Sequence, residues 1–147
     1  MKGRRSVIAV GAAVILGTTG ALVVPAVASA HSATHTLKFT SVEKKSIGFA
    51  KGSGGQQDTD VNGRGKTIGF DMLYFSHASA TSAAVNITVD TKGGFLYCSG
   101  TISFKTGKAS GKVTGGTGAF KGATGTIKAK VLNKAGTKHA VTITYST

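Results

Sequence analysis

Residues 111–126 read GKVTGGTGAFKGATGT, and six of these sixteen residues are glycine. Glycine adopts positive φ angles at no steric cost, so the first glycines after the valine predict a tight strand reversal and the later ones predict bends at barrel corners. The five glycines with this structural role are Gly115, Gly116, Gly118, Gly122 and Gly125. The run does not match a phosphate-binding loop, because Lys121 occupies the place of the third glycine in Gly-x-Gly-x-x-Gly and no predicted helix follows.

After residue 30, apolar and polar residues alternate with a period of two almost throughout, and no segment keeps the 3.6-residue period of a helix. The pattern predicts an all-β domain of about eight antiparallel strands joined by short turns. The expected strands are Leu37–Glu43, Ser46–Ala50, Lys66–Phe75, Ala83–Asp90, Phe95–Phe104, Gly111–Thr114, Ala119–Leu132 and Thr137–Ser146. A single eight-stranded antiparallel β-barrel is the expected architecture, because closure leaves no strand edge unpaired.

The last hairpin has one register that gathers its apolar residues on one face. A three-residue loop at 134–136, with Gly136 in the left-handed position, pairs Ile127 with Ile143. The same register pairs Ala129 with Val141, Val131 with an inward-facing His139, and Gly125 with Tyr145. Lys128 and Lys130 then point outward.

The segment Val113–Gly125 resembles the signature of the allene oxide cyclase and dirigent-like barrel superfamily, in which a Gly-Gly-Thr-Gly turn precedes an aromatic residue and a small-x-Gly bend. The preceding strand Leu96–Ile102 and the closing strand that ends at Thr142–Tyr145 also follow the order of that family, so the resemblance covers Asp58 to Tyr145. The resemblance implies an eight-stranded barrel with an apolar lumen, often self-associating, of the kind that secreted bacterial members form.

The resemblance also implies a function. A barrel of this type binds a small apolar molecule, such as a lipid, a phenolic or a polyketide-like chain, and steers its cyclisation or coupling without a cofactor. Catalysis would then depend on holding a reactive substrate in one conformation more than on a dedicated nucleophile. The sequence leaves open whether any chemistry occurs.

The candidate site residues are those that such a lumen would use. The polar candidates for catalysis are Asp71, Tyr74, Asn86 and His139, and the expected ligand-binding residues are Phe70, Met72, Cys98, Ile102 and Tyr145. Residues 70–75 are apolar on both faces, which indicates a strand that is central or oligomer-facing. Burial there would raise the pKa of Asp71, but the interpretation that we favour is an outward-facing, solvated carboxylate.

Residues 52–65 are polar and glycine-rich, which predicts a long surface loop. Asp58 and Asp60 are expected to make turn contacts there, or to bind a cation loosely, rather than to act as a catalytic carboxylate pair. We expect no metal site: His31 as the amino-terminal residue, together with His35, would be a copper-chelating arrangement, but nothing else in the sequence supports it.

The first thirty residues have the pattern of a secretory signal peptide. A basic start at residues 2–5 precedes an apolar stretch at 7–24, and residues 28–30 form an Ala-Ser-Ala cleavage site. We therefore expect a secreted, extracellular protein whose barrel domain spans residues 31–147. Cys98 is the sole cysteine, so it has no internal disulfide partner and is expected to be buried and inert.

The chain carries 18 Lys+Arg against 5 Asp+Glu, a formal net charge of +13. Removal of residues 1–30, which hold three basic and no acidic side chains, leaves +10. After Asp90 the charged residues are nine lysines and no acid. A solvated surface is the simple explanation. The functional alternative is a non-enzymatic barrel whose lysine face binds anionic cell-surface polymers. Nucleic acid is disfavoured as a partner, because no aromatic residues are interleaved with the lysines.

Overall fold

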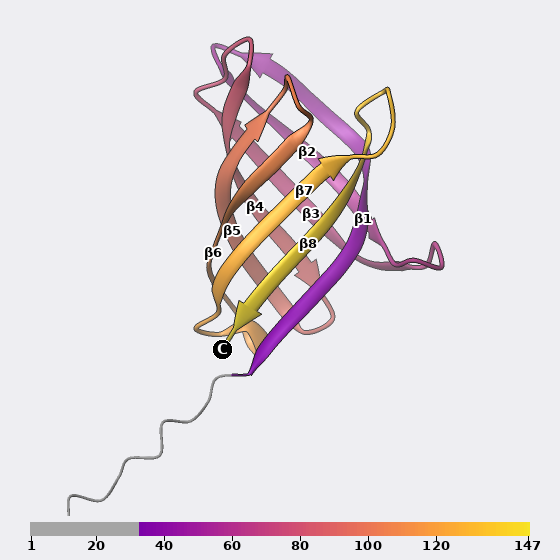
Figure 1. The fold of residues 1–147 in the computed structure, drawn as a ribbon, viewed down its shortest axis with the longest axis vertical. Helices are drawn as coiled ribbons and strands as arrows, with labels where there is room; N and C mark the ends of the chain where they lie inside the picture. The colour runs from indigo at the N-terminus through magenta and orange to yellow at the C-terminus, as the bar shows by residue number, and fades with distance from the viewer. Residues whose placement is uncertain (1–32) are drawn as a thin grey trace, which may run out of the picture. The chain divides into compact units, whose positions relative to one another are not determined.

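The computed structural model describes residues 33–147, and the predicted signal peptide lies outside this range. The described residues form eight strands and one short 3-10 helix (Figure 1). The elements are β1 (Thr34–Ala50), β2 (Ser53–Val61), β3 (Thr67–Ser76), β4 (Ser82–Thr91), β5 (Gly94–Ser103), β6 (Lys108–Gly116), η1 (Gly118–Phe120), β7 (Thr124–Val131) and β8 (Lys138–Ser146). None of the helical structure within this range has the length and hydropathy of a membrane-spanning helix.

The strands form a closed antiparallel barrel, as predicted: each pairs with the next, and β1 also pairs with β8. β1 is long enough to serve two neighbours, because Thr34–Val42 pairs with β8 and Thr40–Ala50 with β2. Antiparallel order places the β1–β2, β3–β4, β5–β6 and β7–β8 connections at one end of the barrel, here called the open end. The remaining connections and η1 lie at the opposite, plugged end (Figure 1).

The first quarter of the barrel differs from the sequence prediction. Leu37–Glu43 and Ser46–Ala50 belong to a single strand, β1, whose register shifts between Glu43 and Lys45. Most of residues 52–65, predicted to be a surface loop, form β2. The prediction was wrong because β2 turns polar side chains, including Asp58 and Asp60, toward the interior, so it lacks the apolar alternation that marks a strand.

The last hairpin confirms the predicted register. Ile127 lies opposite Ile143, Ala129 opposite Val141, Val131 opposite His139, and Gly125 opposite Tyr145. In the connecting loop Gly136 has a φ of 71°, the left-handed conformation that the loop length predicted. Lys128 and Lys130 are exposed on the outside.

The glycine-rich segment is a turn that contains η1. Because η1 and a further turn come first, the predicted strand Ala119–Leu132 begins only at Thr124. Four of the five predicted glycines have positive φ angles: Gly115, Gly118, Gly122 and Gly125. Gly116 does not, and there the reason for glycine is space, since a Cβ would lie 2.5 Å from the Cβ of Phe120.

The hydrophobic core lies inside the barrel and is densest toward the plugged end. Phe120 of η1 is buried and meets the ring of Tyr145 edge-on, with ring centroids 5.5 Å apart. Tyr145 also stacks on His35, with centroids 5.4 Å apart. Leu96, Cys98 and Val113 are buried in the same cluster. These side chains fill the plugged end, so space for a ligand lies on the other side of them.

Candidate functional site

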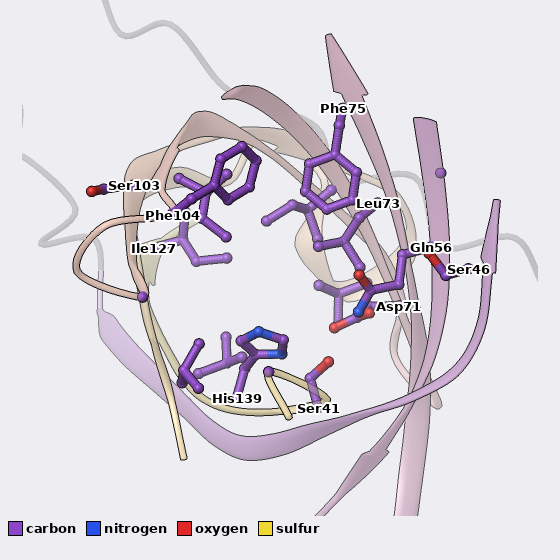
Figure 2. A pocket seen from close by; sticks show the side chains of 18 of the residues that line it. Ser41, Ser46, Gln56, Asp71, Leu73, Phe75, Ser103, Phe104, Ile127 and His139 are labelled. Carbon is purple, nitrogen blue, oxygen red and sulfur yellow. The ribbon is translucent and has the colours of Figure 1, made fainter. Parts of the chain in front are cut away.

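A cavity of about 270 Å³ occupies the part of the lumen next to the open end (Figure 2). The period-two alternation of seven of the eight strands turns every second side chain toward it. Most of the lining is apolar and includes Phe39, Leu73, Phe75, Ile87, Ile102, Phe104 and Ile127. A concave, mostly apolar cavity with a few convergent polar groups is the usual form of a small-molecule site.

Most of the polar lining comes from four adjacent strands. Ser41 on β1, Gln56 on β2, Asp71 on β3 and His139 on β8 all face the cavity. The barrel register gathers them, because His139 lies opposite Ser41 and β2 lies between β1 and β3. Figure 2 shows Ser41, Gln56 and Asp71 along one side of the cavity, across from Phe104 and Ile127. The cavity therefore has one polar wall and one apolar wall.

Asp58 is buried inside the barrel next to this polar wall, and hydrogen bonds hold its carboxyl group. The Ser41 hydroxyl donates to its Oδ2 at 2.5 Å, and the Gln56 side-chain amide donates to both carboxylate oxygens at 2.8 and 2.9 Å. Asp58 has no exposed surface. Hydrogen bonds to a charged acceptor are the strong ones, and these donors suit an ionised carboxylate. Ser41 and Gln56 therefore connect the cavity wall to the buried carboxyl group of Asp58.

Asp60 and Asp71 are buried beside it with fewer hydrogen-bond partners. Both oxygens of Asp60 and Oδ1 of Asp71 have no hydrogen-bond partner among the described residues. Burial, and next the charge of Asp71, raises the pKa of Asp60 from 3.8 to about 8. Burial, and next the charge of Asp58, raises the pKa of Asp71 from 3.8 to about 7. Near neutral pH this interior therefore holds exchangeable protons on carboxyl groups, one of which faces the cavity.

Within residues 33–147, no three His, Cys, Asp or Glu side chains are arranged to hold a metal ion. The prediction that Asp58 and Asp60 make turn contacts in a surface loop is wrong, since both lie on β2 and are 0% and 1% exposed. What these residues offer is a hydrogen-bonded carboxylate beside two carboxylic acids.

The predicted polar candidates divide into two groups. Asp71 and His139 line the cavity. The favoured outward orientation of Asp71 is wrong, because inward Asp71 alternates with outward Met72, and Asp71 is 3% exposed. Tyr74 and Asn86 were placed in the lumen, but they are exposed on the outer face of β3 and β4.

The predicted ligand-binding residues also divide. Ile102 lines the cavity, whereas Phe70 and Met72 are 48% and 63% exposed on the outside of β3 and cannot line the lumen. The strand is apolar on both faces, so its pattern alone did not reveal the inner one. Cys98 and Tyr145 face inward but lie in the packed region toward the plugged end, outside the cavity lining. Burial raises the pKa of the Cys98 thiol to about 12.

The sequence analysis missed Ser41, Gln56 and the pair Asp58 and Asp60 as interior residues. A signal for the last three existed, since Gln56, Asp58 and Asp60 recur with a period of two like the inner positions of a strand. The signal was hidden because a polar residue at every second position normally marks the solvent face. Ser41 had no distinguishing signal in the sequence.

Comparison with known proteins gives the fold. No protein-family model and no curated protein matches the sequence. Solved structures do match: a pyocyanin demethylase has a TM-score of 0.61 at 16% identity, with 74% of this chain and 99% of that chain covered. An exo-specific intermolecular Diels-Alderase has a TM-score of 0.64 at 10% identity, with coverages of 78% and 99%. A pterocarpan synthase dirigent protein has a TM-score of 0.63 at 18% identity, with coverages of 78% and 88%.

The chain shares the closed eight-stranded barrel fold of these dirigent and Diels-Alderase structures. The expected family resemblance is therefore confirmed at the level of architecture. In this barrel, the cavity next to the open end is enclosed by the strands themselves, and η1 with Phe120 packs at the other end.

Proposed function

We propose that the barrel binds a small, largely apolar molecule in its cavity and steers that molecule's cyclisation or coupling. The observation that carries the proposal is the 270 Å³ cavity with one apolar and one polar wall. The fold shared with a Diels-Alderase and a dirigent protein supports the same class of role. An apolar enclosure favours one folded conformation of a flexible substrate, which lowers the entropy cost of ring closure.

The cavity size limits the ligand. An engineered apolar cavity of about 150 Å³ accommodates benzene, so a cavity of about 270 Å³ suits a molecule of one or two rings, or a chain that folds to that size. Drug-sized ligands usually occupy pockets of about 300–1,000 Å³, so this site is at the small end. The ligand class is therefore a compact phenolic, terpenoid or short polyketide-like molecule.

Asp71 is the catalytic residue in this proposal. With a pKa of about 7, it carries a proton in about half of the molecules at neutral pH. A general acid works best when its pKa lies near the working pH. Its carboxyl group can donate a hydrogen bond or a proton to a carbonyl oxygen of the ligand. Such a contact makes an enone more electrophilic, and in a cycloaddition no atom is lost or gained, so the proton returns to Asp71.

Binding is tested with two probes that differ in one polar group: 2-acetylnaphthalene and 2-ethylnaphthalene. Both should raise the melting temperature, because binding to the native state stabilises it. A probe concentration of about ten times Kd corresponds to an increase of about 5 °C. The ketone should give the larger shift through Asp71. Ile102→Trp fills the cavity and should abolish both shifts, whereas Thr101→Trp, its neighbour on the outer face, should keep them. Equal shifts in the two variants would show that the probes bind elsewhere.

Steering is tested with a linear decatrienone, whose diene and enone close slowly to a bicyclic ketone without help. The protein should turn the racemic product into one with a measurable enantiomeric excess by chiral chromatography. The Asp71→Asn variant should close the ring more slowly, and the Ile102→Trp variant should return the racemate. A racemate from a protein that binds 2-acetylnaphthalene would limit the role to ligand binding.

A further inference from the structure

The outside of the barrel carries a lysine face that the cavity does not use. The face consists of exposed outward side chains on β6, β7 and the first half of β1: Lys38, Lys108, Lys112, Lys128 and Lys130. β8 lies between β7 and β1, so these strands are consecutive around the barrel (Figure 1). The lysines therefore belong to one continuous surface.

The strand register brings the charges close together. Lys108 lies directly opposite Lys130, and Lys128 is separated from Lys38 by one residue, Thr142. With neighbouring strands about 4.8 Å apart, the backbones of Lys128 and Lys38 are about 10 Å apart, and Lys128 and Lys130 are about 7 Å apart along their strand. Like charges directly opposite each other destabilise a sheet, so the Lys108–Lys130 pair is unfavourable for folding alone.

A groove runs between these lysines. Lys108, Lys128 and Lys130 line a shallow depression of about 550 Å³, and its other outward-facing residues are small: Thr101, Ser103, Ser110, Ala140 and Thr142. The hydroxyl groups among them can donate and accept hydrogen bonds. The groove thus combines spaced cationic groups with a hydroxyl-bearing floor.

No acidic side chain among the described residues offsets this charge within the groove. Asp58, Asp60 and Asp71 are buried in the lumen, and Asp90 lies on β4, which is not part of the lysine face. Glu43 lies on β1 beyond Val42 and does not line the groove. A surface that serves solubility alone usually intersperses charges of both signs. The separation of charge on this barrel favours an anionic partner on one side.

We propose that this groove binds a linear acidic polysaccharide, through its carboxylate or sulfate groups at the lysines and its hydroxyl groups at the Ser and Thr floor. The lining holds no aromatic side chain on which nucleic-acid bases could stack. It also holds no large apolar side chain that could insert into a bilayer. Of the exposed aromatic residues, Phe70 and Tyr74 lie on β3 and Phe95 and Tyr97 on β5, while Phe104 lines the lumen cavity.

The test uses heparin as the probe and two triple variants with equal net charge. Lys108→Gln, Lys128→Gln and Lys130→Gln together remove the cations of the groove. Lys66→Gln, Lys92→Gln and Lys121→Gln remove three exposed lysines from turns at the plugged end. The groove variant should bind heparin about tenfold more weakly, and its log Kd against log salt slope should fall by about two. The turn variant should match the unmodified protein.

The outcomes separate the proposal from its alternatives. Equal losses in the two variants would mean that overall charge, and not the groove, binds heparin, and would overturn the proposal. Tighter binding of inorganic polyphosphate or of phosphatidylglycerol vesicles than of heparin would overturn the assignment to a polysaccharide. Unsulfated dextran should not bind. A normal melting temperature of the groove variant, together with an unchanged shift by 2-acetylnaphthalene, would show that the fold and the lumen are intact.

Discussion

Asp58 and Asp71 lie directly opposite each other on β2 and β3, with both carboxyl groups buried inside the barrel. Asp58 receives side-chain hydrogen bonds from Ser41 and Gln56, whereas Oδ1 of Asp71 has no partner among the described residues. Two neighbouring carboxyl groups in such different surroundings do not ionise alike, because burial and the charge of the first oppose ionisation of the second. The exchangeable proton of this pair is therefore assigned to Asp71.

The stability of the barrel should fall as the pH rises from about 4 to about 8. The folded-state pKa values of Asp60 and Asp71, about 8 and about 7, are raised above the unfolded value of 3.8. The native state therefore binds more protons than the unfolded state in this window, and the stability that these groups contribute is present below about pH 4 and lost above about pH 8. Thermal unfolding as a function of pH measures this.

The matching variant is Asp60→Asn with Asp71→Asn, which removes both titrations. Its melting temperature should decline less between pH 5 and pH 8 than that of the unmodified protein. The Asp90→Asn variant is the control, because Asp90 is exposed on the outside of β4. An equally steep decline in the double variant would contradict the assignment of the protons to these two groups.

Removal of the donors to Asp58 should destabilise the fold. Ser41→Ala or Gln56→Ala leaves a buried carboxylate short of hydrogen bonds, which costs about 1–3 kcal/mol in the free energy of unfolding. Gln57→Ala is the matched control, since Gln57 is the exposed neighbour of Gln56, and it should change stability by less than about 0.5 kcal/mol. Urea denaturation gives the three values, and similar losses for Gln56→Ala and Gln57→Ala would count against the role of the hydrogen bonds.

Gly125→Ala should be strongly destabilising. A Cβ at this position would overlap the carbonyl oxygen of Thr144 and lie 2.7 Å from the Cα of Tyr145, and the residue has a φ of 156°. Displacement of β8 together with backbone strain should cost at least about 2 kcal/mol. Gly48→Ala in β1 has nothing within 4 Å of its Cβ and should be tolerated. Chemical denaturation of both variants measures the difference.

Cys98 should resist thiol reagents in the native protein. It is 3% exposed, and a pKa of about 12 leaves almost no thiolate at neutral pH. Labelling by an aromatic disulfide reagent should proceed only as fast as the barrel opens, and 6 M guanidinium should expose one thiol per chain. Rapid labelling without denaturant would show that Cys98 reaches the solvent in the folded state.

The parts of the structure that sequence could predict are those where alternation and turn chemistry agree. Ile127, Ile143 and Gly136 fix the last hairpin, because one register alone satisfies the apolar face and the left-handed loop residue. β2 could not be predicted in this way. Its inward Asp58 and Asp60 recur at every second position, which normally marks a solvent face. Inside the barrel, Ser41 and Gln56 donate hydrogen bonds to Asp58, and burial raises the pKa of Asp60.

The candidate site was predicted only in part for a related reason. Ile102 and His139 line the cavity, as does Asp71 against its favoured outward orientation, whereas Phe70 and Met72 lie on the outer side of β3. Side chains on both faces of that strand are apolar, so the choice of inner face depends on the pairing of Asp71 with Asp58, a contact with β2. Because β2 was not predicted to be a strand, the sequence could not show which face of β3 points inward.

The pairing of β1 with β8 joins Thr34 to Ser146, so the described barrel begins and ends at the same place. Within residues 33–147, the other seven strand pairings connect sequence neighbours, and this seam alone links the two ends of the domain. Seven hairpins can form locally, while the seam must await the rest of the chain and carries the largest loop-closure entropy. The same adjacency makes the domain suitable for circular permutation. A short linker across the seam, with new termini in the Lys134–Gly136 loop, would keep every strand neighbour unchanged.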